Sequence, residues 1–205
     1  SAVGILCLAL AGCAAVPDIA PLQATGKAAP QIVGRGGPLT AEQSKAILER
    51  LGSDAGDDAL LKRHTAYEQA ISESPLIAGN RTHLLRDGPE TFRAMFSAMR
   101  NARNHINLEY YIFEDVESDG AHLVDLLVAK RQAGVAVNVI YDSYGSGSTA
   151  LAFLERLKQA GINLVSFNPV NPLESKVPYS FNDRDHRKIL VVDGRTAIVG
   201  GVNLS

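Results

Sequence analysis

The segment from His186 to Asn203 reads H-R-K-I-L-V-V-D-G-R-T-A-I-V-G-G-V-N. Two apolar runs flank the dipeptide Asp193-Gly194, and this pattern predicts a β-hairpin with a two-residue turn. Side chains two residues apart on a strand point to the same face, so we expect His186 and Lys188 to face one shared space. An imidazole beside a fixed cation suits attack on a phosphate ester.

A two-residue turn also sets the expected register of this hairpin. Lys188 then lies opposite Val199, His186 lies opposite Gly201, and Asn203 follows on the same face of the sheet. A slip of one residue would turn His186 and Lys188 to the other face. The alternative interpretation is an ordinary buried hairpin whose histidine is satisfied by a neighbouring polar group.

Two further features of the hairpin bear on its chemistry. The pair Gly200-Gly201 has no side chains, so an anionic group can approach the backbone closely. Asp193 has the opposite parity and lies at the turn. We include it in the candidate catalytic set with His186 and Lys188, as an orienting or structural carboxylate rather than one that meets the substrate.

The spacing H-x-K-x4-D followed by G-G-x-N resembles the motif of the phospholipase D (PLD) superfamily. The wording of residues 179–203 is most similar to the bacterial cardiolipin synthase branch. The resemblance continues upstream through N-H-I-N-L-E-Y-Y-I-F (residues 104–113) and A-G-V-A-V-N-V-I-Y-D-S-Y-G-S (residues 133–146), and covers about residues 81–205. Gly201 departs from the many members that have serine there.

This resemblance implies roles for individual residues. His186 would be the nucleophile that forms a phosphohistidine, or the acid that protonates the leaving alcohol. Lys188 and Asn203 would hold the phosphate oxygens. No metal and no cofactor are implied, because lysine and backbone N–H groups supply the positive charge that phosphate requires.

Three more residues are possible site-lining groups. The resemblance points to Glu109 and Tyr111, although a polar sheet edge explains them equally well. Asp142 follows a β-branched run that predicts a strand, and loops after parallel strands are where α/β sheets place ligand contacts. Asp142 is equally suited to capping a turn. The G-S-G-S stretch of residues 145–148 is a weak phosphate-loop lookalike without the lysine of a nucleotide-binding loop.

The PLD superfamily pairs two such motifs across one site, whereas this sequence holds one. We therefore expect a fragment that carries the first half of the site, with the second half in a missing C-terminal part. The alternative is a one-motif subunit that completes its site by homodimerisation.

Composition limits the range of partners. The net charge is −2 and the pI is near 6.2, so no global basic field draws the chain to nucleic acid. A membrane phospholipid such as phosphatidylglycerol is the substrate that the resemblance implies, and nucleic acid is an unlikely one.

The N-terminal region predicts export and anchoring. Residues 2–11 form an apolar run that is too short to span a bilayer but suits the core of a signal peptide. The run leads into L-A-G-C, which resembles a bacterial lipoprotein signal, so residues 1–13 are expected to be a signal remnant with Cys13 as the lipid-bearing residue. A generic secretory leader or a hydrophobic anchor remains the alternative. This predicts a cell-envelope location, at the outer membrane or the periplasmic face.

The rest of the chain predicts three further regions. Residues 14–39 are rich in Ala, Pro and Gly and fit a flexible linker. Residues 40–80 form a helical segment, with a Thr40/Gln43 capping box, a helix over 41–51 closed by Gly52, and a second helix over 57–72. Residues 81–205 form the PLD-like half.

Within residues 81–205, strand and helix patterns alternate. Strands are expected at 82–86, 105–113, 135–141 and 162–167. Helices are expected at 89–103, 119–133 and 149–160, and a long loop at 168–179 precedes the hairpin. This order predicts an α/β fold with a mixed β-sheet flanked by helices on both faces, preceded by the short helical segment.

The sequence thus predicts an enzyme, a phosphatidyltransferase of cardiolipin synthase type that works through a phosphohistidine. One alternative is a PLD-type phosphodiesterase that hydrolyses lipids or nucleic acid. Another, from a different class, is a non-catalytic envelope lipoprotein that keeps the fold.

Overall fold

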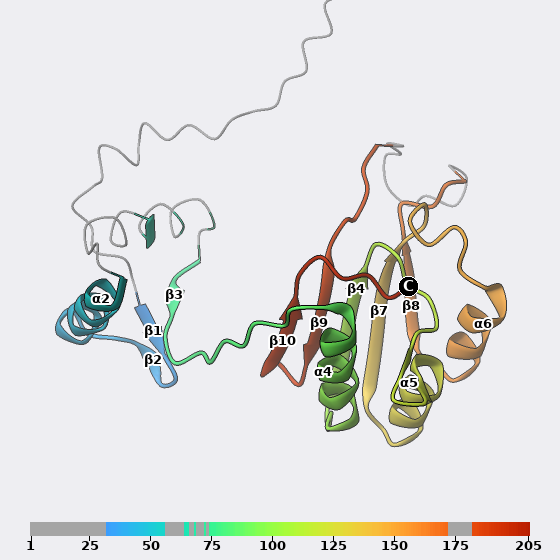
Figure 1. The fold of residues 1–205 in the computed structure, drawn as a ribbon, viewed down its shortest axis with the longest axis horizontal. Coiled ribbons are helices and arrows are strands. Elements are labelled where there is room, and N and C mark those ends of the chain that lie inside the picture. Colours follow the sequence, from blue (N-terminus) through green and yellow to red (C-terminus); the bar gives the residue numbers. More distant parts are fainter. Residues whose placement is uncertain (1–31, 56–63, 66–67, 69–71, 73, 172–181) are drawn as a thin grey trace, which may run out of the picture. The chain divides into compact units, whose positions relative to one another are not determined.

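The computed structural model describes residues 32–55, 64–65, 68, 72, 74–171 and 182–205 (Figure 1). Cys13, the predicted signal remnant and most of the predicted linker lie outside these residues. The chain divides into two compact units, Ser1–His83 and Leu84–Ser205, which are described separately.

The first unit contains a small sheet with the strand order β2-β1-β3. Strand β1 (Ile32–Gly34) pairs antiparallel with β2 (Gly37–Pro38) and parallel with β3 (Leu76–Ile77). Ile32 is fully buried. We predicted residues 32–39 to be part of a flexible linker, but they belong to this folded unit. The β-branched pair at 32–33 has a partner strand far along the chain.

Helix α2 (Ala41–Ala55) starts where the sequence predicts. The capping box is confirmed, since Gln43 N–H donates to Thr40 Oγ1 at 3.2 Å and Thr40 N–H donates to Gln43 Oε1 at 3.0 Å. The predicted end at Gly52 is wrong. An interior glycine costs a helix only about 1 kcal/mol relative to alanine, which did not stop this one. The second predicted helix, 57–72, lies largely outside the described residues.

The second unit is built on a five-stranded mixed sheet with the order β10-β9-β4-β7-β8. The strands are β4 (His105–Tyr110), β7 (Ala136–Asp142), β8 (Asn163–Phe167), β9 (Lys188–Val192) and β10 (Thr196–Val199). Strands β4, β7 and β8 are parallel, β9 runs antiparallel to β4, and β10 returns antiparallel to β9. The predicted α/β class and mixed sheet are confirmed.

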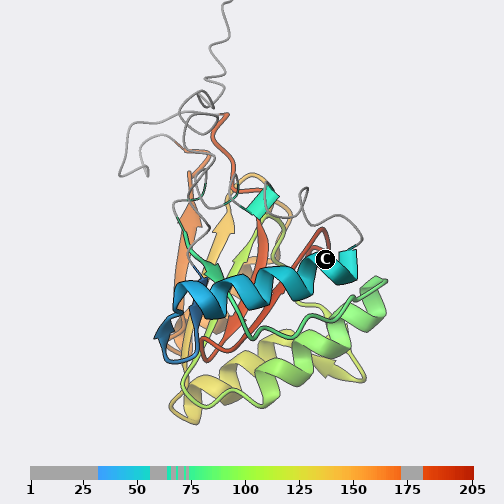
Figure 2. The same cartoon turned by 90° about the vertical axis from the view of Figure 1, so that its left-hand side faces the viewer.

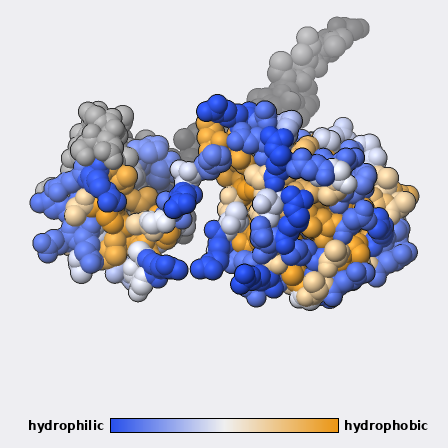
Figure 3. Space-filling model, turned by 60° about the horizontal axis from the view of Figure 1, so that its bottom comes forward, coloured by the Kyte–Doolittle hydropathy of each residue, from blue (hydrophilic) through white to orange (hydrophobic). Residues whose placement is uncertain are grey.

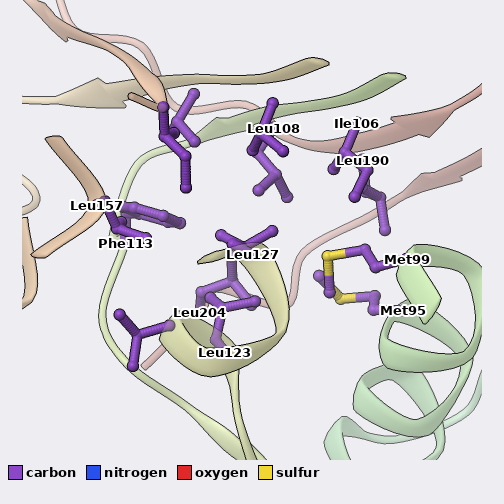
Figure 4. Close-up of a cluster of buried hydrophobic side chains, with 14 of the residues drawn as sticks. Met95, Met99, Ile106, Leu108, Phe113, Leu123, Leu127, Leu157, Leu190 and Leu204 are labelled. Carbon is purple, nitrogen blue, oxygen red and sulfur yellow. The ribbon is translucent and has the colours of Figure 1, made fainter. Parts of the chain in front are cut away.

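Helices α4 (Gly88–Arg100), α5 (Leu123–Gln132) and α6 (Leu151–Gln159) pack on the sheet, and α4 and α5 lie side by side (Figures 1 and 2). Their apolar side chains form one cluster with alternate residues of β4, β7 and β9 (Figure 4). The members with essentially no exposure include Met95, Phe96, Met99, Ile106, Leu123, Leu127, Leu157 and Leu190. In the described residues, all three helices therefore cover the same face, whereas the sequence predicted helices on both.

The opposite face of the sheet has a different character. An amide ladder crosses three strands, since Asn138 donates to Asn107 at 2.8 Å and Asn163 donates to Asn138 at 3.3 Å. Ile140 and Val165 are exposed there by 36% and 46%. The predicted strand at 135–141 is present as β7, and mainly its alternate residues are buried.

One predicted strand of this unit is absent, and one predicted helix begins later than expected. Residues 82–86 form no strand. The helix expected from Asp119 begins at Leu123 instead, because Asp119 (φ 51°) and Gly120 (φ 75°) form the tight turn between β5 (Glu117–Ser118) and β6 (Ala121–His122). A left-handed pair of residues favours a hairpin turn over a helix start.

The hairpin β9–β10 exists, but its register is shifted by one residue. Val192 pairs with Thr196 rather than with Arg195, and Ile189 rather than Lys188 pairs with Val199. The extra residue is Arg195, whose N–H closes the turn on Val192 O at 3.0 Å. The slip moves β10 relative to β9 and leaves the face of β9 unchanged, since β9 takes its own register from β4.

No helix among the described residues has both the length and the apolar character needed to cross a bilayer. The surface face in Figure 3 is mainly hydrophilic, with hydrophobic patches between the charged side chains.

Candidate functional site

One edge of the five-stranded sheet gathers most of the candidate residues. The carboxyl ends of the parallel strands β4 and β7 meet there, with Tyr110 opposite Tyr141. The antiparallel strand β9 begins at the same edge, with Lys188 opposite Tyr110. Loops that leave this edge include residues 111–116, 143–150 and the segment that leads into the motif. Ligand sites of α/β sheets lie at such an edge.

Lys188 is the first residue of β9 and is buried, with 6% of its surface exposed. Its Nζ donates a 2.8 Å hydrogen bond to the carbonyl oxygen of His186 and lies 5.0 Å from the centre of the Tyr111 ring. Burial lowers the pKa of Lys188 from its ordinary value, and the negative charge of Asp185 partly opposes this shift. A partly desolvated ammonium interacts strongly with an anion, because little water screens it.

His186 precedes β9 and is exposed. The sequence placed it within the strand, whereas the strand begins two residues later. Its imidazole nevertheless lies beside the same ring as Lys188, with the ring centres of His186 and Tyr111 4.7 Å apart and their planes tilted by 59°. Tyr111 therefore contacts both members of the pair.

The glycine pair and Asn203 are arranged differently from the prediction. Strand β10 ends at Val199, so Gly200 and Gly201 leave the sheet, although Gly200 N–H still donates to Lys188 O at 3.3 Å. A β-carbon at either glycine would meet no atom within 4 Å, so the protein itself leaves open space at both positions.

Asn203 lies beside the extension of β4 and not on a continuation of strand β10, which ends at Val199. Its Oδ1 accepts a 3.4 Å hydrogen bond from Ile112 N–H. The next residue, Leu204, is fully buried and forms an isolated parallel bridge with Phe113. Glu114 N–H donates to Leu204 O at 2.7 Å. This bridge fixes the chain immediately after Asn203.

Asp193 lies at the other end of β9, about 17 Å along the strand from Lys188 at ~3.3 Å per residue. Its carboxylate accepts hydrogen bonds of 2.8–2.9 Å from the backbone N–H groups of Arg103, Asn104 and His105. These bonds, with that of His105 contributing most, lower the pKa of Asp193 to about 2. The structure separates Asp193 from His186 and Lys188 and gives it the structural position that the sequence considered.

The carboxylates of Asp142 and Glu109 are both engaged by protein groups. Asp142 is fully buried, and its Oδ1 accepts from Tyr144 N–H and Gly145 N–H, each at 2.9 Å. It therefore caps the turn after β7, the second of the two roles that the sequence allowed. Glu109 forms a 2.8 Å ion pair with Arg187, whose side chain is 67% exposed.

Sequence reasoning missed Asp185 next to the site, and it missed the contacts that Gly145 and Ser146 make with Tyr111. Asp185 is 5% exposed, and its Oδ2 has no hydrogen-bond partner within the described part of the chain. Ser146 donates to Tyr111 O at 3.0 Å, and Gly145 packs against the ring of Tyr111. For Gly145 and Ser146, the only local signal was their spacing after Asp142 and a β-branched run. The same pattern also resembles a phosphate loop.

Comparison with known proteins points in one direction. Residues 95–205 match the family model described as "Cardiolipin synthase, PLD-like domain". The chain is 36% identical over 159 residues to a cardiolipin synthase of Alkalihalophilus pseudofirmus, an alignment that covers 76% of the chain and 30% of that relative. It is 37% identical over 166 residues to a cardiolipin synthase of Geobacillus thermodenitrificans, covering 80% of the chain and 31% of that relative. The chain thus spans less than a third of the length of these relatives.

Among solved structures, the chain resembles Nuc, a phospholipase D family member from Salmonella typhimurium. The sequences are 23% identical, the alignment covers 56% of the chain and 64% of Nuc, and the TM-score is 0.43.

Proposed function

Because the chain belongs to the cardiolipin synthase, PLD-like domain family, we propose that it carries one half of an active site for phosphatidyl transfer between membrane phospholipids. One observation supports this more than any other. The imidazole of His186 and the ammonium of Lys188 both contact the ring of Tyr111, at the edge of the sheet where α/β proteins bind ligands. A nucleophile or proton carrier beside a desolvated cation is the arrangement that a phosphodiester requires.

The first step transfers the phosphatidyl group to a histidine. An imidazole nitrogen attacks phosphorus, a P–N bond forms, and the P–O bond to the head-group alcohol breaks. A second histidine, acting as an acid, protonates the departing oxygen. Lys188 holds the charge on the phosphate oxygens, and Asn203 contributes an amide to the same group. His186 takes one of the two histidine roles.

The second step releases the phosphatidyl group to an acceptor. The hydroxyl of phosphatidylglycerol or another alcohol loses its proton to the second histidine and attacks phosphorus. The P–N bond breaks and the free imidazole returns. Water in place of the alcohol gives hydrolysis, so the acceptor that reaches the site decides between synthase and hydrolase.

The partner motif in this proposal comes from outside the described residues. The relatives are about three times as long as the matched region, which favours a second motif elsewhere in a longer chain over one supplied by a second copy. A second copy would place two identical edges face to face and predicts an obligate homodimer.

The proposal is tested with the full-length protein in mixed micelles of phosphatidylglycerol. Formation of cardiolipin and release of glycerol are measured for wild type, His186→Asn and His122→Asn. His122 lies in the same unit beside Asp115 and serves as the matched control. We expect His186→Asn to lose both products and His122→Asn to keep them. Wild-type protein without either product, or a fully active His186→Asn, would contradict the proposal.

The covalent intermediate needs a separate measurement. Rapid quenching with phospholipid labelled in its phosphorus should trap an acid-labile, base-stable adduct in the wild type. If His186 is the nucleophile, His186→Asn forms no adduct. If His186 is the acid, His186→Asn forms the adduct only from a phospholipid analogue whose leaving group departs without a proton, such as a p-nitrophenyl ester, and not from phosphatidylglycerol. Turnover by the wild type without any adduct would exclude the phosphohistidine route.

We also propose that Cys13 anchors the protein in the bacterial envelope, on the strength of the preceding apolar run and the L-A-G-C sequence. Labelled palmitate should enter the wild type and not Cys13→Ser when each is expressed with its native leader. Labelling of Cys13→Ser to the same extent would refute the anchor.

A further inference from the structure

Tyr111 is held in place by the turn that follows β7, residues 142–146. The Ser146 hydroxyl donates to Tyr111 O at 3.0 Å and accepts from Phe113 N–H at 3.1 Å. One buried hydroxyl therefore joins two peptide groups on the chain that leaves β4, and Ser146 is only 6% exposed. Because its hydroxyl already donates one hydrogen bond to the backbone and accepts another, this serine is poorly placed to bind a phosphate.

Gly145, which precedes Ser146 in the same turn, packs directly against Tyr111. A β-carbon at this position would lie 2.4 Å from Tyr111 O and 2.7 Å from two carbons of the Tyr111 ring. Such distances are shorter than van der Waals contact, so any larger residue would displace Tyr111 or the turn. Its φ is not in the left-handed region, so the requirement for glycine is one of space rather than of backbone conformation.

The same turn is tied to the residue that precedes His186. Asp142 Oδ1 accepts from Gly145 N–H, and Asp142 Oδ2 accepts from Asp185 N–H at 2.9 Å. Ser146 N–H donates to the Asp142 carbonyl at 2.9 Å. The buried carboxylate of Asp142 thus holds both the turn after β7 and the backbone of Asp185, which leads into the motif. Buried networks whose groups are satisfied are rigid, because each lost bond leaves a desolvated polar group.

We propose that Gly145 and Ser146 are positioning residues, which hold the Tyr111 ring and thereby set the relative placement of the His186 imidazole and the Lys188 ammonium. The glycine-serine turn acts through Tyr111 and does not itself bind phosphate. This inference rests on the proposed function, because it assigns the turn to the same site.

The decisive variant is Gly145→Ala in the full-length protein, compared with Gly88→Ala. A β-carbon at Gly88 would meet no atom within 4 Å, so the control makes the same chemical change in open space. We expect kcat to fall about 100-fold in Gly145→Ala, since a displacement near 1 Å can cost that much. KM for the lipid should change little, and Gly88→Ala should match the wild type in both constants.

A spectroscopic readout separates positioning from a general loss of stability. The Tyr111 ring lies 4.7 Å from the His186 ring, so ring currents shift the His186 proton resonances. In folded Gly145→Ala these resonances should move, whereas those of His105, which lies beside Asp193 at the other end of the sheet, should stay. This measurement needs no turnover, so it tests the placement even if the proposed activity is wrong.

Two further variants guard against misfolding and identify the moving part. Ser146→Ala adds no atoms and removes the bridge between Tyr111 O and Phe113 N–H, and should lower kcat about 10-fold by the same misplacement. Tyr111→Leu removes the ring and should lower kcat as Gly145→Ala does. Unmoved His186 resonances together with unchanged kcat in Gly145→Ala and Ser146→Ala would overturn the inference. Wild-type kcat in Tyr111→Leu would overturn it as well.

Discussion

The Lys188 ammonium donates to the carbonyl oxygen of His186 at 2.8 Å, so the cation of the motif is anchored to the backbone of its histidine. The bond spans only two residues, and both side chains also contact Tyr111. The cation and the imidazole therefore form one local unit, whose geometry depends on the chain that enters β9 as much as on the sheet.

Lys188→Met should slow turnover strongly without unfolding the protein. The loss of one charged stabiliser of the phosphate predicts a fall in kcat of about 100- to 1000-fold. The midpoint of thermal unfolding should stay close to that of the wild type, because methionine fills a similar volume and removes a desolvated charge. Steady-state kinetics and calorimetry check both parts. Lys158→Met, an exposed lysine on α6, is the control, and equal kinetics for the two variants would contradict the role of Lys188.

Asp185→Asn should move the alkaline limb of the pH–rate profile to lower pH. The carboxylate of Asp185 raises the pKa of Lys188 against the lowering effect of burial, so removing its charge lets that pKa fall further. Asparagine keeps the oxygen that accepts the 3.1 Å bond from Arg187 N–H. The profile of kcat/KM between pH 6 and 10 is the measurement. An alkaline limb that stays in place, or moves upward, would show that Lys188 does not govern it.

Asp193→Asn should weaken the fold at neutral pH and leave kcat nearly unchanged. The pKa of about 2 lies below the value near 3.9 of an unfolded aspartate, so the native state holds the ionised form. The stabilisation by Asp193 is therefore present above pH ~4 and is lost as the pH falls from there toward 2. Urea unfolding of both proteins should give midpoints that differ most at pH 7 and converge at low pH.

Asp119→Asn makes the same chemical change at an exposed turn and should leave the pH dependence of unfolding intact. A constant difference between wild type and Asp193→Asn at every pH would contradict the assignment. A large fall in kcat for folded Asp193→Asn would return Asp193 to the active site.

Leu204→Ala should destabilise the second unit by about 2–5 kcal/mol, as expected for a buried leucine. Leu204 is fully buried and forms the parallel bridge to Phe113 that fixes the segment after Asn203. Leu151, which is 78% exposed on α6, gives the matched control, with an expected change of less than about 0.5 kcal/mol. Equal unfolding midpoints for Leu204→Ala and Leu151→Ala would show that burial of the Leu204 side chain contributes nothing to stability.

Local patterns predicted the parts of the fold that depend on neighbouring residues. The capping box of Thr40 and Gln43 lies within four consecutive residues, and the predicted helix at 89–103 is present as α4. The hairpin around Asp193 was also recognised. Its register was not, because Arg195 adds a residue to the turn while Asp193 is bound by residues 103–105, about 90 positions away.

In the candidate site, too, only the features that depend on neighbouring residues could be predicted. The pairing of His186 with Lys188 was readable from two positions in one motif. The support from Ser146 and Gly145 was not, since it acts across more than 30 residues and takes a form that resembles a phosphate loop. Asn203 was misplaced because the sequence predicted a strand that continues, whereas β10 ends at Val199.

Strand β9 runs antiparallel to β4. Its first residue, Lys188, lies at the edge of the sheet with the candidate site, and Asp193 follows its last residue at the opposite edge. A mutational screen across residues 186–193 should therefore yield two kinds of mutant. Substitutions near His186 should give stable proteins that are catalytically inactive at every temperature. Changes near Asp193 should give heat-sensitive proteins that recover in the cold, although a linear reading of the motif would class both as catalytic lesions.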